Sequence, residues 1–263
     1  MTQHVNKFSI VLPAKNEAKS LKTLLPNLRD LFPEAEIIVV NDGSTDNTVK
    51  ICQDNHVICI THAYSMGNGA AIKTGARIAT GDIIVFMDAD GQHDPGDITH
   101  LLAKIDDGHE MVVGARTVGS QSSLARRIAN TIYNRLASYM TEHDIQDLTS
   151  GFRAVRARHF LKFLYMLPNG FSYPTTSTMA FFRSGLPVAY VPIQTTKRTG
   201  KSHIKLLKDG FRFFVIILKI GSLFSPMRFF LTISAALLLT GVFYYAYTFL
   251  LWHLSLMQTL LFS

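Results

Sequence analysis

The sequence predicts an α/β protein with a mostly parallel sheet and helices on both of its faces, followed by membrane-associated segments. Short apolar runs alternate with amphipathic stretches over the first 114 residues, which is typical of repeated βα units. Polar and glycine-rich clusters follow these runs, where strands would open into loops. A long uncharged stretch near the C-terminus has the length of a membrane span.

Apolar runs predict the strands, and the amphipathic stretches between them predict the helices. We expect strands at 8–12, 37–40, 57–60, 83–87 and 111–114. We expect helices at 18–31, 47–55, 70–79 and 95–105. Because βα units recur, the sheet should be mostly parallel, with helices on both faces.

The most informative polar cluster contains Asp88 and Asp90. These two carboxylates stand one residue apart, directly after the apolar run 83–87, which predicts a buried parallel strand. Ligands of open α/β sheets bind at the carboxyl ends of strands. Two hard oxygen ligands at such a point suit a divalent metal that also holds a diphosphate. The pair therefore indicates a nucleotide-sugar enzyme.

Asp42 stands at the end of the second predicted strand, beside Gly43. A carboxylate there can accept hydrogen bonds from a base N–H or from ribose hydroxyls, although the same residues also form ordinary turns. Asp46, at the start of the next predicted helix, is expected to cap it.

A glycine pair, Gly67 and Gly69, precedes the third predicted helix, which carries Lys73. Glycines allow close approach of the backbone to a ligand. The spacing is not a dinucleotide-binding fingerprint, because Ile72 stands in the sixth place, and no Gly-Lys-Ser/Thr makes it a Walker A loop.

Charge is divided unevenly along the chain, whose net charge is +7. Residues 1–114 carry 9 Lys and Arg against 15 Asp and Glu, and residues 115–263 carry 17 against 4. This division fits a metal site that faces phosphate-binding groups. We expect no nucleic-acid partner, because no aromatic-basic module or helix-turn-helix pattern is found. Cys52 and Cys59 lack zinc spacing and predict reduced thiols in the cytosol, and the polar stretch 1–7 predicts no signal peptide.

The C-terminal region predicts a membrane anchor. Residues 229–251 include no charged side chain and would extend ~35 Å as a helix, enough to cross a bilayer. Aromatic residues gather toward the far end, and Lys and Arg lie only before the span, which predicts a cytoplasmic catalytic domain. The preceding stretch, 203–222, interleaves basic and apolar residues. It predicts either an amphipathic helix on an anionic membrane surface or an ordinary surface helix of the domain.

These patterns predict four parts: a catalytic domain at 1–202, an amphipathic segment at 203–225, a transmembrane helix at 226–252 and an apolar tail at 253–263. The tail is too short for a second span by itself. It is expected to be a tail, an interfacial piece or an incomplete hairpin. Packing between spans would allow a homo-oligomer.

As a set, the motifs resemble the family 2 glycosyltransferases, which have the GT-A fold, a Rossmann-like sheet with helices on both faces. The motifs that carry this resemblance are Pro13-Ala14-Lys15-Asn16-Glu17, Asn41-Asp42-Gly43-Ser44, Gly67-Asn68-Gly69-Ala70-Ala71 and Asp88-Ala89-Asp90-Gly91-Gln92-His93. Three more are similar to the polyprenyl-phosphate branch, which includes dolichol-phosphate mannose synthases: Gly114-Ala115-Arg116, Asp147-Leu148-Thr149-Ser150-Gly151-Phe152-Arg153 and Arg198-Thr199-Gly200-Lys201-Ser202. The resemblance covers residues from about 8 to about 202.

The resemblance implies an inverting transfer of sugar from a UDP- or GDP-linked donor to undecaprenyl or dolichyl phosphate, with Mg²⁺ or Mn²⁺, at the bacterial inner membrane. It implies metal contacts from Asp88, Asp90 and Gln92. It implies a nucleotide-sugar pocket lined by Pro13, Asn16, Glu17, Asp42, Gly67, Gly69, Lys73, Asp88 and Ala89. Phosphate of the donor or acceptor would meet Arg116, Arg153, Arg198, Lys201 and Ser202. The catalytic residues would be Asp90, Asp147, Arg116 and Arg153.

A lipid phosphate is already largely ionised at neutral pH, so it needs positioning more than deprotonation. Asp147 would orient or weakly activate it, or would only cap its loop or pair with Arg153. The family often has Asp where this chain has Asn41 and Lys where it has Asn68, which leaves the preferred base open.

Two other functions fit parts of the pattern. A polysaccharide synthase of the same family would carry a Gln-x-x-Arg-Trp motif and several spans, but the single tryptophan, Trp252, lies at the membrane. A catalytically inactive nucleotide-sugar-binding subunit is disfavoured because Asp88 and Asp90 are both present.

Overall fold

A computed structural model describes residues 7–117, 124–170, 172–195 and 226–261, together with Val215, Leu218, Lys219 and Ser222. The chain forms two units, residues 1–217 and 218–263, which are described separately. Arg198, Lys201 and Ser202 lie outside the described residues, as does the predicted amphipathic segment except for those four positions.

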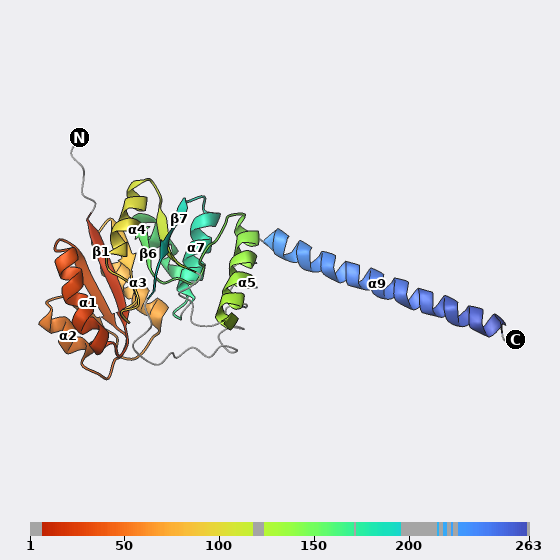
Figure 1. The fold of residues 1–263 in the computed structure, drawn as a ribbon, viewed down its shortest axis with the longest axis horizontal. Helices are drawn as coiled ribbons and strands as arrows, with labels where there is room; N and C mark the ends of the chain where they lie inside the picture. The colour runs from red at the N-terminus through yellow and green to blue at the C-terminus, as the bar shows by residue number, and fades with distance from the viewer. Residues whose placement is uncertain are drawn as a thin grey trace. The chain divides into compact units, whose positions relative to one another are not determined.

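The first unit contains a seven-stranded sheet in the order β3-β2-β1-β4-β6-β5-β7. Figure 1 shows this sheet with helices packed around it. Its strands are β1 (Phe8–Ala14), β2 (Glu36–Asn41), β3 (Ile58–Thr61), β4 (Ile83–Phe86), β5 (Met111–Arg116), β6 (Arg153–Arg156) and β7 (Val188–Ile193). The described helices of this unit are α1 (Ala18–Leu31), α2 (Thr48–Asp54), α3 (Asn68–Ile78), α4 (Asp97–Asp106), α5 (Leu124–Thr141), α6 (Ala157–Phe160), the 3₁₀ helix η2 (Leu161–Met166) and α7 (Tyr173–Arg183). The predicted mostly parallel α/β sheet is confirmed, and the first five strands lie within two residues of the predicted ones.

The sheet separates two hydrophobic cores because successive strand residues point to opposite faces. Ile10 and Leu12 of β1 pack with the leucines of α1 and with Ile98 of α4 on one face. Val11, between them, packs on the other face with α3 and α7. The buried leucines of α1 recur every three or four residues, as the helical period requires. Helices therefore cover both faces of the sheet.

Strand β6 is antiparallel to both of its neighbours, β4 and β5. Its first residue, Arg153, pairs with Phe86, the last residue of β4. The loop before β6 therefore reaches the same edge of the sheet as the loop after β4. A parallel strand would place this loop at the opposite edge. The reversal thus brings two separate motifs together.

The second unit contains helix α9 (Pro226–Leu261), 36 residues long. Proline is well placed at the first turn of a helix, where its missing N–H costs nothing. The stretch Pro226–His253 is long and apolar enough to cross a membrane, and it is the one such helix among the described residues. The helix continues beyond Trp252 through most of the predicted tail.

Candidate active site

The predicted acidic pair lies at the carboxyl edge of the sheet, directly after β4. The Asp88 side chain is 38% exposed, and Asp90 is also partly exposed. Oδ1 of Asp90 accepts the backbone N–H of Gln92 at 3.2 Å, which closes the turn of the loop. Ala89, between the two acids, is buried. Both carboxylates are therefore held at a ligand-accessible edge, as the sequence predicts.

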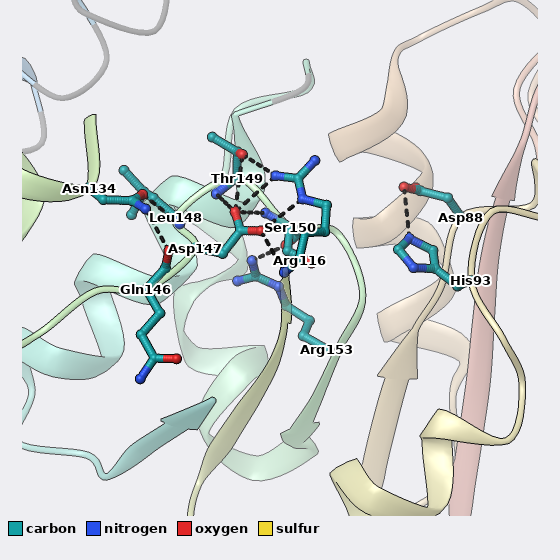
Figure 2. A network of polar contacts seen from close by, with 10 residues as sticks. All are labelled: Asp88, His93, Arg116, Asn134, Gln146, Asp147, Leu148, Thr149, Ser150 and Arg153. Carbon is teal, nitrogen blue, oxygen red and sulfur yellow. Dashed lines mark hydrogen bonds and ion pairs between the residues drawn. The ribbon is translucent and has the colours of Figure 1, made fainter. Parts of the chain in front are cut away.

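Arg116, the last residue of β5, makes a two-pronged ion pair with Asp147 (Figure 2). Its Nε lies 2.8 Å from Oδ2 and its Nη2 lies 2.9 Å from Oδ1. Nη2 also donates to the Thr149 hydroxyl at 2.6 Å. The Arg116 side chain is 27% exposed and that of Asp147 is 6% exposed. This geometry is the strongest form of a carboxylate–guanidinium contact, and it holds the cation at the site.

Asp147 also organises the loop that precedes β6. Its Oδ1 accepts the backbone N–H groups of Thr149 and Ser150, both at 3.1 Å. Burial alone would raise the pKa of Asp147, but the hydrogen bonds and charge of Arg116 outweigh it and lower the pKa below its ordinary value. Asp147 is thus an ionised loop anchor that pairs with Arg116, where the sequence allowed a pair with Arg153.

Arg153 does not lie where a phosphate could reach it, and this corrects its predicted role as a phosphate contact. Its side chain is fully buried and donates to the carbonyls of Ser150 and Pro174 and to the hydroxyls of Ser177 and Thr178. Burial lowers the pKa of the Arg153 guanidinium. The residue shares the alternating strand face of Val155, which packs toward α7. Its apolar neighbours Phe152, Ala154 and Val155 are the sequence signal for a buried strand position.

The acidic loop and the loop before β6 are in van der Waals contact. A Cβ atom added to Gly151 would lie 3.2 Å from Oδ2 and 3.4 Å from Oδ1 of Asp88. Glycine at this position lets the carboxylate approach the backbone. Burial alone would lower the pKa of Arg116, but its hydrogen bonds and ion pair with Asp147 raise it above the ordinary value. The charge of Asp88 adds a smaller contribution in the same direction. Acids and cation therefore share one site.

The loops after β1 and β2 are joined by hydrogen bonds. Oδ1 of Asn16 accepts the N–H of Thr45 at 2.7 Å, and the N–H of Asn16 donates to the Ser44 hydroxyl at 2.9 Å. Asp46 accepts the N–H of Ala18 at 3.0 Å with one oxygen and that of Thr48 at 3.0 Å with the other. Asp46 therefore caps the start of α2, as predicted, and also the start of α1. Pro13, near the end of β1, and Glu17, in the loop that follows, are partly exposed at this edge.

Asp42 lies at the predicted strand end, but protein donors surround its carboxylate. It contacts Nδ1 of His62 at 2.8 Å and accepts from the Ser65 hydroxyl at 2.8 Å. The N–H groups of Met66 and Gly67 donate to it at 2.7 and 2.9 Å. In this arrangement Asp42 shapes the loop after β3, a role that the turn chemistry of its own segment did not reveal. Its contact with a nucleotide stays a prediction.

Acid should weaken the fold through Asp42. Burial would raise its pKa, but the hydrogen bonds from His62 and the loop outweigh it and lower the pKa below its ordinary value. A depressed folded-state pKa adds stability above about pH 4, and that stability is lost as the pH falls through the folded value. We expect Asp42→Asn to flatten the decline in unfolding midpoint between about pH 5 and pH 2, measured by urea titration. An unchanged pH profile would contradict this.

Gly67, Gly69 and Lys73 contact loop 167–170, and their place in a nucleotide-sugar pocket stays a prediction. The N–H of Gly69 donates to the carbonyl of Gly170 at 3.2 Å, so the start of α3 is capped by another loop. A Cβ atom on Gly67 would clash with the carbonyl of Asn169. Lys73 donates to the carbonyl of Leu167 at 3.1 Å and to the side chain of Asn169. The close backbone approach that the glycines permit is therefore to loop 167–170.

We expect Gly69→Ala to lower the free energy of unfolding of the first unit by ~1–3 kcal/mol, the usual cost of overpacking. A Cβ atom there would collide with the carbonyl of Pro168 and would lie 2.7 Å from that of Gly170. Gly170→Ala is the matched control, because a Cβ atom at that position meets nothing within 4 Å. The urea midpoint, followed by circular dichroism, measures both changes. Equal midpoints for the two variants would refute the close contact.

The donor atoms at the acidic loop fit a metal that binds together with a diphosphate. Within the described parts of the chain, no group of three or more His, Cys, Asp and Glu side chains could hold a metal ion. Asp88 and Asp90 offer two carboxylates, and the predicted third ligand, Gln92, offers an amide oxygen. Mg²⁺ commonly binds one or two carboxylates together with substrate phosphates and water.

Comparison with known families matches both units. The profile of glycosyl transferase family 2 matches residues 9–164, and that described as the GtrB C-terminal hairpin matches residues 225–263. An undecaprenyl-phosphate 4-deoxy-4-formamido-L-arabinose transferase of Proteus mirabilis is 36% identical over 169 residues, 60% of this chain and 51% of the relative. One of the same description from Photorhabdus laumondii is 34% identical over 170 residues, 61% of this chain and 52% of the relative. The chain thus spans about half the length of these curated relatives.

Solved structures share the fold at low sequence identity. Glucosyl-3-phosphoglycerate synthase of Mycobacterium tuberculosis, in complex with phosphoglyceric acid, superposes with a TM-score of 0.68 at 19% identity, covering 83% of this chain and 81% of that one. Its complex with Mn²⁺, UDP and glucosyl-3-phosphoglycerate gives 0.65 at 20% identity and the same coverage. The predicted GT-A fold is confirmed. The family profile covers more than half of the residues, and the acidic and basic motifs lie at one edge of this sheet. The chain therefore belongs to glycosyl transferase family 2.

Proposed function

We propose that this chain transfers a sugar from a nucleoside-diphosphate sugar to a polyprenyl phosphate at a membrane surface. One observation carries the proposal. The partly exposed acids Asp88 and Asp90 lie at the same sheet edge as Arg116, whose guanidinium is held by Asp147, and the second unit of the chain contains an apolar helix long enough to cross a membrane. The curated relatives are named as transferases of undecaprenyl phosphate, which supports this acceptor class.

The donor would bind across the loops that end β1, β2 and β4. Pro13 lies near the end of β1, and Asn16 and Glu17 lie in the loop that follows, which hydrogen bonds join to the loop after β2. The nucleoside would bind there, with Asp42 supporting the neighbouring loop. Its diphosphate would lie toward Asp88 and Asp90, where a hard cation fits. The solved structures with bound UDP support a nucleoside diphosphate, and the choice between UDP and GDP stays open.

A divalent ion, Mg²⁺ or Mn²⁺, would be held by Asp88, Asp90 and Gln92 and would stabilise the charge that grows on the leaving diphosphate. Arg116 would act on the same charge or on the acceptor phosphate. Its partner Asp147 keeps the guanidinium in place and accepts no proton in this role, because its pKa lies below the ordinary value. The acceptor phosphate is already ionised at neutral pH, so the protein needs only to position it.

The membrane would supply the acceptor. Helix α9 is apolar over Pro226–His253 and would extend ~42 Å over these 28 residues, enough to cross the hydrocarbon core. Basic residues gather on the N-terminal side of the apolar stretch, ending with Lys219 and Arg228, which favours a cytoplasmic catalytic unit at the bacterial inner membrane. Arg198, Lys201 and Ser202 would add phosphate contacts from the segment before the helix. A homo-oligomer, formed by packing between spans, is part of the same proposal.

A transfer assay tests this function. The full chain, purified in detergent, receives undecaprenyl phosphate, Mg²⁺ or Mn²⁺ and a panel of radiolabelled UDP- and GDP-sugars, and label is counted in the organic phase. We expect one donor to label the lipid and EDTA to abolish labelling. Phosphoglyceric acid, present in one of the solved structures, serves as the competing soluble acceptor. If no donor labels the lipid while circular dichroism shows folded protein, the proposal fails.

A further inference from the structure

His93 is buried in the acidic loop and packs against the loop before β6. Its ring stacks on Phe152, with centroids 4.9 Å apart and planes inclined by 19°. Phe152 is itself fully buried, so the plane of the imidazole is set by the core. Nε2 of His93 lies 3.9 Å from Oδ2 of Asp88 (Figure 2). The stack therefore aims one ring nitrogen at the carboxylate.

The contacts of the ring select its tautomer. Nδ1 of His93 is buried and has no hydrogen-bond partner among the described residues. A proton on Nδ1 would bury an unpaired donor and would turn the lone pair of Nε2 toward a carboxylate. A proton on Nε2 instead places a donor toward Asp88. The neutral tautomer with Nε2–H is therefore favoured.

The Asp88 carboxylate also lies near backbone that is itself fixed. A Cβ atom on Gly151 would lie 3.2 Å from Oδ2 of Asp88 and 3.3 Å from the Tyr173 hydroxyl. That hydroxyl donates to the carbonyl of Gly151 at 3.0 Å. Arg153 donates to the neighbouring carbonyl of Ser150. Asp88 thus lies near both an imidazole held by stacking and a backbone segment held by hydrogen bonds.

We propose that His93 is a positioning residue that sets the orientation of Asp88 for the metal and diphosphate of the donor. The inference deepens the function proposed above and depends on it. At 3.9 Å the contact is longer than a hydrogen bond. Contacts of this kind are often long in unliganded enzymes and shorten in the substrate complex. Partners that orient a ligating carboxylate typically change metal affinity or activity 10–100-fold when removed.

Metal binding tests this role apart from turnover. The full chain in detergent is titrated with Mn²⁺ in the presence of UDP, and in parallel GDP, with free Mn²⁺ followed by electron paramagnetic resonance. We expect His93→Ala to weaken Mn²⁺ binding ~10–100-fold. His93→Gln, which keeps an N–H donor without the stacked ring, should fall between. Nucleotide binding in EDTA should not change. His143→Ala is the matched control, because that imidazole also stacks on a phenylalanine, Phe182, at 4.6 Å.

A double-mutant cycle separates positioning from folding. In an Asp88→Asn background, His93→Ala should cause little further loss of Mn²⁺ affinity, because the residue acts through Asp88. Unchanged Mn²⁺ binding in both His93 variants overturns the proposal, and so does equal loss of nucleotide binding in EDTA, which would mark a purely structural histidine. If the wild-type chain binds Mn²⁺ and transfers sugar, only this inference falls. If the wild type binds neither Mn²⁺ nor nucleotide, the proposed function falls with it.

Discussion

Replacement of Asp90 by alanine should lower sugar transfer at least ~10³-fold while the protein stays folded, since metal and electrostatic stabilisation of a leaving group accounts for several kcal/mol of the barrier. Asp90 is partly exposed in the loop after β4, and its Oδ1 accepts the N–H of Gln92 within the same loop. Its loss therefore leaves the hydrophobic cores intact. The labelled-lipid assay measures the rate, and the urea midpoint measures the fold.

Asp94→Ala is the control for Asp90, because Asp94 is an exposed acid of the same loop. It accepts the N–H of Gly96 at 2.8 Å near the start of α4, so its removal should affect stability slightly and transfer little. Unfolding of the Asp90 variant would show that the acidic pair is structural. Full activity of that variant would remove the carboxylate from the proposed chemistry.

Replacement of Arg116 by alanine should lower the free energy of unfolding by ~3–5 kcal/mol, because it leaves a buried carboxylate without its partner. Asp147 is 6% exposed and accepts both prongs of the guanidinium. Arg116→Lys should recover only part of the loss, since an ammonium group cannot reproduce the fork. Urea unfolding of the full chain, followed by circular dichroism, measures these differences.

Arg158→Ala is the matched control for Arg116. Its ion pair with Glu110 is short, 2.7 Å, but the Arg158 side chain is 68% exposed. Such surface pairs contribute ~0–1 kcal/mol at most. A similar loss in both variants would mean that burial does not strengthen the Arg116–Asp147 pair. Transfer should also fall in the Arg116 variant, because the guanidinium lies at the site, and should persist in the Arg158 variant.

The strands and helices of the first 116 residues could be predicted because their signals are local. The apolar run 83–87 contains strand β4, and the helical spacing of leucines in 18–31 coincides with α1. Asp46 was expected to cap a helix and does so. Such features depend on periodicity and turn chemistry within a few residues. The membrane-length helix is a composition signal of the same local kind.

The roles of individual side chains were predicted less well, because a local motif does not specify which distant residues will contact it in the folded protein. Gly67 and Gly69 do permit close approach, but the object they approach is loop 167–170. Arg153 was expected at a phosphate, yet its strand position turns it toward α7. His93 was not singled out, because the stacking on Phe152 that orients its ring is visible only in the folded structure. Each of these contacts joins residues distant in the sequence.

The sequence by itself determined the alternation of strands and helices, the place of Asp88 and Asp90 after a buried strand, and the apolar C-terminal helix. The tertiary structure decided which loops meet. Strand β6 runs antiparallel between β4 and β5, so the loop carrying Asp147 and Gly151 turns to the edge that holds Asp88 and Arg116. Strand direction and order depend on packing between distant segments. Periodicity within one segment does not contain that information.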